Sequence, residues 1–434
     1  MVEFISPRLR SGTAEGSVSA RALVSRFAPA LFRRFAPELF RRFAPELSRR
    51  SGPKLSWRFA PALLLATVLA VPGSVLAQEG NGGDVLKGPV GPMPYEIVTG
   101  WHEEFAPEGY AFGGNSGVWA ESPDRIFVSM RGETRLPEDV PDDYLGFAGS
   151  IGINVLTDTD RRTWRHCLYT LNSEGEVREM WDHWDHLCSD SDGPGPHRLR
   201  INPYDPERRV WVVNETHHQI YVFSNDGREL LLTLGERGVP GDDWNHFARP
   251  QDVAFLPDGR ILVADGLDNH RIMVLDSDGD YITEIGGYGT EPGQFQGIHA
   301  VAVGPGGRIF GLDRSGGRVN VFRTTDDIAE FELVATWDDF NLPLDIIVNE
   351  DAVWMTDLNP LRFIKLDFQG NHLYTWLVPS EMPDGFAEVH TISVDSELNL
   401  YAGDNIHGRT QKLVPLPDAD PELIVRQMWV APSR

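Results

Sequence analysis

The stretch from Asn245 to Gly286 has the pattern of four short strands joined by tight turns. The runs QDVAFL, RILVAD, RIMVLD and YITEIG are separated by PDG, GLDNH and SDGD. Turn residues between short β-branched runs are typical of a four-stranded antiparallel meander. Such a sheet has one buried face and two edges, so it requires further sheets of the same kind to pack against.

The opening of this pattern recurs along the chain. It is found as NSGVWA at Asn115, PHRLRI at Pro196, PQDVAF at Pro250, IHAVAV at Ile298, PLDIIV at Pro343 and VHTISV at Val389. Each opening is followed by a short turn and a second strand. The second residues of the openings are 81, 54, 48, 45 and 46 positions apart, close to the ~40 to 50 residues of a propeller blade. We therefore predict an all-β fold, a six-bladed β-propeller.

Two further features complete this expected fold. The long first interval contains a Pro- and Asp-rich insertion, Leu136 to Arg161, which we expect to be a loop over one face. Ring closure is expected to use the strand from Tyr95 to Trp101 against the last blade, in a register that the sequence does not give.

The part of the chain before the propeller consists of segments that differ in composition. Residues 1–57 are basic and repeat the octet RFAPALFR as RFAPELFR and RFAPELSR. A proline in every octet excludes a long helix, so we interpret this segment as low-complexity sequence, with a basic interaction arm as the alternative. Residues 58–77 contain the apolar stretch Pro61 to Ala77 and end in Val75-x-Ala77, which is the pattern of a signal peptide cleaved before Gln78.

The remaining segments are a leader over residues 78–110, with the possible ring-closing strand, and the propeller over residues 111–434. The alternative to a signal peptide is a transmembrane anchor, but a span requires ~20 apolar residues. We therefore expect an exported protein, periplasmic or extracellular, with no membrane span after cleavage.

The charge of the exported part restricts its partners. The first 77 residues hold 12 of the 39 Lys and Arg residues and 4 of the 64 Asp and Glu residues, which leaves 27 basic and 60 acidic residues and a net charge of −33 for the rest. A chain this acidic repels phosphate backbones, so nucleic acid is excluded as a partner. We expect a monomer that acts on a small-molecule or peptide substrate.

Both cysteines, Cys167 and Cys188, lie in the exported part and flank a predicted hairpin. In an oxidising compartment this arrangement favours a disulfide bond within one blade. Two free buried thiols are the alternative.

Histidine occupies the second position of three openings, as His197, His299 and His390. These openings belong to the second, fourth and sixth blades, so the three side chains are expected to converge on the propeller axis at one depth. A lone histidine is usually solvated or satisfied within a core. Three in register on alternate blades predict a metal site with an open coordination position, the arrangement of catalytic zinc.

Two arginines follow second strands, Arg131 in the first blade and Arg314 in the fourth. Each would lie where the chain turns at a blade edge. One interpretation is a salt bridge to a neighbouring blade. If both point to the axis, they could hold a carboxylate beside the metal.

These residues carry a resemblance to a known family. The repeats resemble NHL repeats, and the combination of SGVWAESPDRIFVSMRG, PHRL, NHFARPQDVAF, PGQFQGIHAV, LDRSGGRVNVF and VHTI resembles the peptidyl-α-hydroxyglycine α-amidating lyases. The resemblance implies a six-bladed propeller with zinc bound by His197, His299 and His390. It also implies active-site arginines at Arg131 and Arg314.

Two positions depart from that family. Leu267 stands where the resemblance places an active-site tyrosine, the natural base of the reaction. Thr391 stands where it places an acidic ligand of a structural calcium, so calcium binding is left open.

The resemblance implies a zinc-dependent lyase that cleaves a carbinolamide N–C bond and yields a peptide amide and glyoxylate. Two alternatives remain open. One is a metal-dependent propeller hydrolase of small esters or lactones, and the other is a non-catalytic NHL propeller that binds peptide or protein partners.

Overall fold

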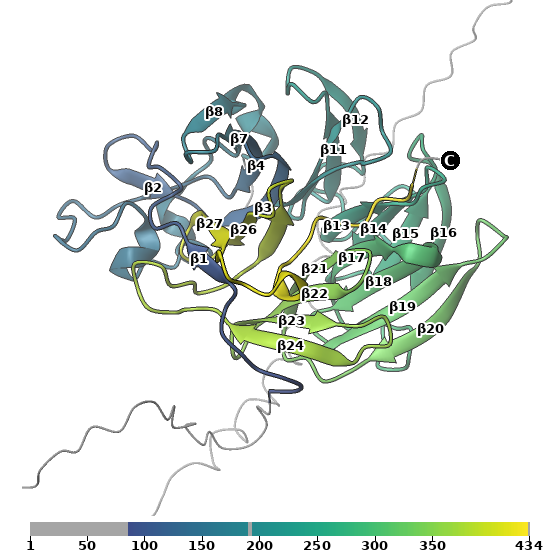
Figure 1. Ribbon diagram of the computed structural model, residues 1–434. Helices are drawn as coiled ribbons and strands as arrows, with labels where there is room; N and C mark the ends of the chain where they lie inside the picture. Colours follow the sequence, from purple (N-terminus) through teal and green to yellow (C-terminus); the bar gives the residue numbers. More distant parts are fainter. Residues whose placement is uncertain (1–85, 190–192, 433–434) are drawn as a thin grey trace, which may run out of the picture. The chain divides into compact units, whose positions relative to one another are not determined.

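Six four-stranded antiparallel sheets surround a common axis in the computed structural model, which describes residues 86–189 and 193–432 (Figure 1). The innermost strand of each sheet contacts the innermost strand of the next, and β25 returns to β3. The described part of the chain is therefore the six-bladed β-propeller that the repeat predicts.

The strands of the blades have the following bounds. Blade 1 holds β3 (Asn115–Ser122), β4 (Arg125–Met130), β7 (Leu168–Leu171) and β8 (Val177–Met180), and blade 2 holds β9 (Pro196–Ile201), β10 (Val210–Asn214), β11 (Gln219–Phe223) and β12 (Leu230–Leu234). Blade 3 holds β13 (Pro250–Phe255), β14 (Ile261–Asp265), β15 (Arg271–Leu275) and β16 (Tyr281–Gly286), and blade 4 holds β17 (Ile298–Gly304), β18 (Arg308–Asp313), β19 (Arg318–Thr324) and β20 (Phe331–Trp337). Blade 5 holds β21 (Pro343–Val348), β22 (Val353–Asp357), β23 (Arg362–Leu366) and β24 (His372–Leu377), and blade 6 holds β25 (Thr391–Val394), β26 (Leu400–Asp404) and β27 (Arg409–Pro415).

The core lies between neighbouring blades. One apolar cluster joins Phe310 and Leu312 of blade 4 to Ile346 and Met355 of blade 5, and similar clusters lie at the other blade boundaries. Each sheet thus buries its apolar face against the next sheet, which is why no blade is stable alone.

Blade 6 takes its outermost strand from the start of the domain. Strand β1 (Tyr95–Ile97) pairs antiparallel with β27, with Tyr95 opposite Pro415. The pairing lies within the segment expected to close the ring, and it uses three residues of that segment. Tyr95 is buried there, and its hydroxyl accepts a hydrogen bond of 2.8 Å from the backbone N–H of Val425.

The insertion from Leu136 to Arg161 is a loop without strands, as expected, but short strands flank it. A three-stranded sheet of β2 (Tyr110–Phe112), β5 (Glu133–Arg135) and β6 (Arg162–Thr163) lies beside the blade, and 3-10 turns η1 (Ala148–Ile151) and η2 (Thr159–Arg161) occur between β5 and β6. The insertion also contacts blade 6, because the N–H groups of Gly149 and Val155 donate to the carbonyls of His407 and Ile406.

The cysteine prediction requires a correction. Cys167 precedes β7 and Cys188 follows the 3-10 helix η3 (Asp182–Leu187), and both are buried free thiols, not the disulfide bond that we favoured. Burial, followed by the neighbouring Cys188 thiol, raises the pKa of the Cys167 thiol well above its usual value. The alternative of two free buried thiols describes this structure.

The chain after β27 crosses the ends of the inner strands that lie farthest from their openings. It passes through η5 (Pro421–Leu423), and the N–H of Trp429 then donates to the carbonyl of Val348 at 2.7 Å. This yellow segment runs across the sheets in Figure 1. The residues of the basic repeat and of the signal-peptide prediction lie outside the described ranges. No helix within those ranges is long and apolar enough to cross a membrane.

Candidate metal centre and active site

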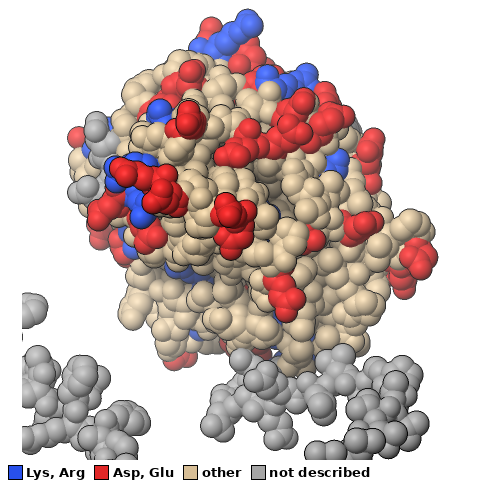
Figure 2. Space-filling model, turned by 90° about the vertical axis from the view of Figure 1, so that its left-hand side faces the viewer, with Lys and Arg blue, Asp and Glu red and all other residues tan. Residues whose placement is uncertain are grey.

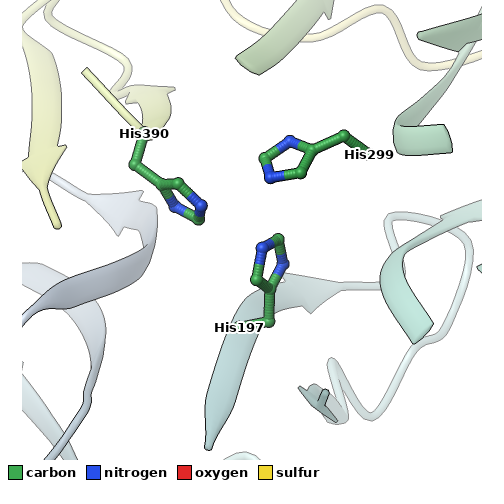
Figure 3. Close-up of side chains that lie close together, drawn as sticks. All are labelled: His197, His299 and His390. Atoms are coloured by element: carbon green, nitrogen blue, oxygen red, sulfur yellow. The ribbon is translucent and has the colours of Figure 1, made fainter. Parts of the chain in front are cut away.

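The three histidines of the openings meet at the axis. His197 and His299 are the second residues of β9 and β17, and His390 directly precedes β25. One nitrogen of each ring lies within 4.8 Å of one nitrogen of the others, and all three residues are buried. The ring centroids are 4.7 to 5.1 Å apart and the rings stand nearly perpendicular to one another (Figure 3). The convergence predicted from alternate blades is therefore present.

Each imidazole is oriented by a main-chain carbonyl of the following blade. The Nδ1 atoms of His197, His299 and His390 lie 2.6, 2.7 and 2.8 Å from the carbonyl oxygens of Gln251, Leu344 and Ser116. These acceptors are the second residues of the three openings that lack histidine. Because a carbonyl only accepts, each Nδ1 carries the hydrogen and each Nε2 retains its lone pair.

The charge state of the rings suits a metal. Burial, followed by the other histidines or nearby arginines, lowers the pKa of all three imidazoles well below the usual value, so they are neutral near pH 7. The Nε2 of His299 is buried and has no hydrogen-bond partner. Three neutral imidazoles with free Nε2 lone pairs fit a zinc ion with a fourth, open position.

A second ring of residues lies at the same end of the channel. In each blade the second strand runs antiparallel to the first, so the residue that follows the second strand returns to the level of the opening. These equivalent positions are occupied by Arg131, Glu215, Gly266, Arg314, Leu358 and Asn405. Four of these six positions near the level of the histidines therefore carry charged or polar side chains.

Arg131 and Arg314 have the positions expected from the sequence, directly after β4 and β18. Arg131 is buried and its Nη2 lies 3.9 Å from Oε2 of Glu215 in the next blade, so it makes a long ion pair between blades. Neither guanidinium group donates a hydrogen bond to any described residue, and both Nε atoms are buried and unpartnered. Burial lowers the pKa of Arg131 to about 10 and also lowers that of Arg314. Two charged donors without acceptors are suited to an anionic ligand.

Leu267 follows Gly266 in the turn after β14 and is partly buried. Its Cδ2 lies 3.4 Å from the point that a Cβ on Gly297 would occupy, two residues before His299. An apolar side chain thus lies where the resemblance places a tyrosine.

Two acidic side chains at the site were not predicted. Glu215 is buried and accepts from the guanidinium of Arg249 as well as facing Arg131. Glu388 is also buried, and burial, followed by the charge of Asp404, raises its pKa to about 7. The signals that could have found them are the equivalence of Glu215 to Arg131 and the position of Glu388 two residues before His390.

No carboxylate stands beside His390 where the resemblance implies a calcium ligand, because Thr391 is there. A different cation lies in the channel. The guanidinium of Arg198 is fully buried and donates to the carbonyls of His390 and Leu344, each at 2.7 Å, and it lies 3.5 Å from the carboxylate of Asp345. Arg198 thus links blade 2 to blades 5 and 6 below the histidines.

Comparison with known proteins identifies relatives of this chain. The model of the NHL repeat matches residues 247–282, which is blade 3. The chain is 37% identical over 143 residues to the peptidyl-glycine alpha-amidating monooxygenase of Mus musculus, a match that covers 31% of this chain and 14% of the relative. It is 34% identical over 110 residues to a probable peptidyl-alpha-hydroxyglycine alpha-amidating lyase of Caenorhabditis elegans, which covers 25% of this chain and 31% of that one.

A further relative is the peptidyl-alpha-hydroxyglycine alpha-amidating lyase 1 of Drosophila melanogaster, 34% identical over 143 residues, with 30% of this chain and 26% of the relative covered. The chain spans less than a third of the length of each of these relatives.

Among solved structures, a streptogramin B lyase has a TM-score of 0.43 at 10% identity and covers 74% of this chain and 96% of its own. A gluconolactonase from Xanthomonas campestris has a TM-score of 0.46 at 14% identity, with 74% and 90% covered. The matches in sequence confirm the expected kinship with the amidating lyases.

Proposed function

We propose that this protein is an exported zinc-dependent lyase that cleaves the N–C bond of a peptidyl-α-hydroxyglycine and yields a peptide amide and glyoxylate. One observation carries the proposal: three neutral imidazoles with free Nε2 atoms lie at the same end of the channel as two guanidinium groups that have no acceptor. The kinship with proteins named amidating lyases supports it.

The substrate would present a carboxylate, a hydroxyl group and an amide nitrogen on one carbon. Arg131 and Arg314 would hold the carboxylate through charge-assisted hydrogen bonds, and this places the reacting carbon toward the histidines. A zinc ion on His197, His299 and His390 would polarise the hydroxyl group and lower its pKa.

In the reaction the C–N bond breaks, its electron pair remains on nitrogen, and nitrogen takes up a proton to become the amide. The hydroxyl group loses its proton as its oxygen becomes the carbonyl oxygen of glyoxylate. Arg131 and Arg314 would stabilise negative charge that develops on the glyoxylate portion.

Leu267 cannot accept the hydroxyl proton, because its side chain is a hydrocarbon. This observation favours a second candidate function, a metal-dependent hydrolase of small esters or lactones that would use the same three histidines. A non-catalytic propeller that binds peptide or protein partners would require neither the metal nor the arginines.

The proposal is tested with protein beginning at Gln78, by measuring zinc content and the release of glyoxylate from N-benzoyl-α-hydroxyglycine. We expect about one zinc per chain and glyoxylate release that a chelator abolishes. Leu267→Tyr should increase the rate, because a phenol is restored beside the histidines, whereas Leu231→Tyr on the exposed outer strand β12 should not. Zinc-loaded protein that releases no glyoxylate, with or without Leu267→Tyr, would exclude the lyase. The absence of stoichiometric zinc, unchanged by substitution of the histidines, would favour the non-catalytic propeller.

A further inference from the structure

Glu388 is a buried carboxyl group that the proposed reaction does not yet use. Its side chain is 7% exposed, and its Oε2 atom is fully enclosed but has no hydrogen-bond partner. Asn405 lies near the carboxyl group and acts to lower its pKa, against the effect of burial. A buried carboxylate oxygen without a donor is costly, and such atoms in folded proteins require an explanation.

The position of Glu388 directs it to the site rather than to the blade core. It precedes the metal-site residue His390 of blade 6 by two positions, and its charge acts on both Arg131 and Arg314. Asn405 is itself a member of the ring of residues that follow the second strands. Glu388 therefore lies near both arginines and near the histidine site.

Each of these charged side chains lacks one kind of hydrogen-bond partner. The arginines lack an acceptor and Glu388 lacks a donor. A ligand that satisfies all of them carries a carboxylate and, close to it, an O–H or N–H group. A 2-hydroxycarboxylate has this pattern, and Leu267, the apolar neighbour of the site, offers neither a donor nor an acceptor from its side chain.

We propose that Glu388 is a substrate-binding residue whose Oε2 accepts the hydrogen bond of the substrate hydroxyl group while Arg131 and Arg314 bind the adjacent carboxylate. The proposal deepens the proposed function and rests on it for the identity of the substrate. It assigns recognition of the hydroxyl group to a side chain of blade 6.

The alternative role for Glu388 is to balance the charge of the two arginines. The two roles differ in one measurable quantity. A charge-balancing carboxylate affects every bound carboxylate equally, whereas a hydrogen-bond acceptor affects only ligands that carry the hydroxyl group. The informative quantity is therefore the ratio of two affinities and not either affinity alone.

The experiment uses two ligands in which carbon replaces the scissile nitrogen, so neither can be cleaved. They are 2-hydroxy-4-oxo-4-phenylbutanoate and 4-oxo-4-phenylbutanoate, which differ only in the hydroxyl group. Their dissociation constants are measured by calorimetry on the protein as purified, on Glu388→Met and on Glu397→Met, an exposed residue in the turn between β25 and β26 of the same blade.

We expect the protein to prefer the hydroxylated ligand and Glu388→Met to lower this preference by about tenfold to a hundredfold, the loss expected for one hydrogen bond to a charged group. Glu397→Met should keep the preference. An unchanged ratio in Glu388→Met, or a protein that binds neither ligand, would overturn the proposal. Glyoxylate release with an unchanged ratio would refute only the role of Glu388, and a lowered ratio without glyoxylate release would refute only the lyase.

Discussion

At the residue scale, the site is defined by buried polar groups that have no hydrogen-bond partner within the described part of the protein. The three imidazoles are each fixed through Nδ1, and their Nε2 atoms are left for another partner. Arg131 illustrates the cost, because burial disfavours its charge and Glu215 lies too far away to hydrogen-bond it. Uncompensated buried charge is destabilising, so its presence is better explained by ligand binding than by folding.

If Arg131 serves ligand binding and not folding, Arg131→Met should have opposite effects on function and on stability. The Michaelis constant for glyoxylate release should rise at least about tenfold, because one charge-assisted contact to the carboxylate is lost. The thermal midpoint should stay the same or rise, since Glu215 remains paired with Arg249 and the buried charge is gone.

Arg125→Met, at the start of β4, is the matched control for Arg131, which directly follows the same strand. Arg125 donates to Glu121 and Glu179, so its loss should lower the thermal midpoint and leave the Michaelis constant unchanged. If Arg131→Met destabilises the protein as much as Arg125→Met does, Arg131 has a structural role and the interpretation fails.

At the scale of elements, the repeat allowed the blades and the meeting of the histidines to be predicted, because similar four-stranded units that recur along a chain have few ways to pack. The inserted sheet could not be predicted, since β6 has two residues and β5 has three, too short for an alternating pattern. Glu388 was missed because spacing alone does not show which way a side chain outside a strand points. The cysteines were placed correctly in one blade, but the sequence does not give their oxidation state.

The inserted sheet is attached to blade 1 by a titratable pair. Nδ1 of His166, just before β7, lies 2.6 Å from Oε1 of the fully buried Glu133 in β5. The hydrogen bond that His166 donates to Glu133 raises the pKa of His166, with Asp185 adding to the effect and burial and Arg165 opposing it. Because the folded pKa exceeds the unfolded value of about 6.5, the stabilisation is complete below pH 6.5 and is lost as the pH rises through the folded pKa.

The corresponding prediction compares thermal midpoints of the protein and of His166→Asn between pH 5.5 and pH 9. Asn tolerates the positive φ of 54° at this position, so backbone strain is kept constant. The difference in midpoint should be largest at the acidic end and should shrink toward pH 9. A difference that does not vary with pH would show that protonated His166 is not what holds the sheet.

At the scale of the whole domain, the two ends of the propeller axis differ: one carries the candidate site, and the C-terminal segment crosses the other. The openings of the inner strands carry the histidines, with Glu388 directly before the last opening, and the ends of the second strands bring Arg131 and Arg314 to the same end. The segment around Trp429 crosses the other end and bonds to Val348 and, through Ala431, to Tyr204. A ligand would therefore reach the histidines from the end that carries the arginines. Acidic side chains are prominent on the face shown in Figure 2, as the excess of Asp and Glu predicts.

The central claim is that histidines from alternate blades form one zinc centre, and X-ray absorption at the zinc edge tests it most directly. We predict one zinc per chain with three imidazole nitrogens at ~2.0–2.1 Å and an oxygen as the fourth ligand. His299→Ala, which removes one of the three imidazoles, should abolish this signal. Zinc that is absent, that has sulfur ligands, or that keeps the same spectrum in His299→Ala would contradict the claim.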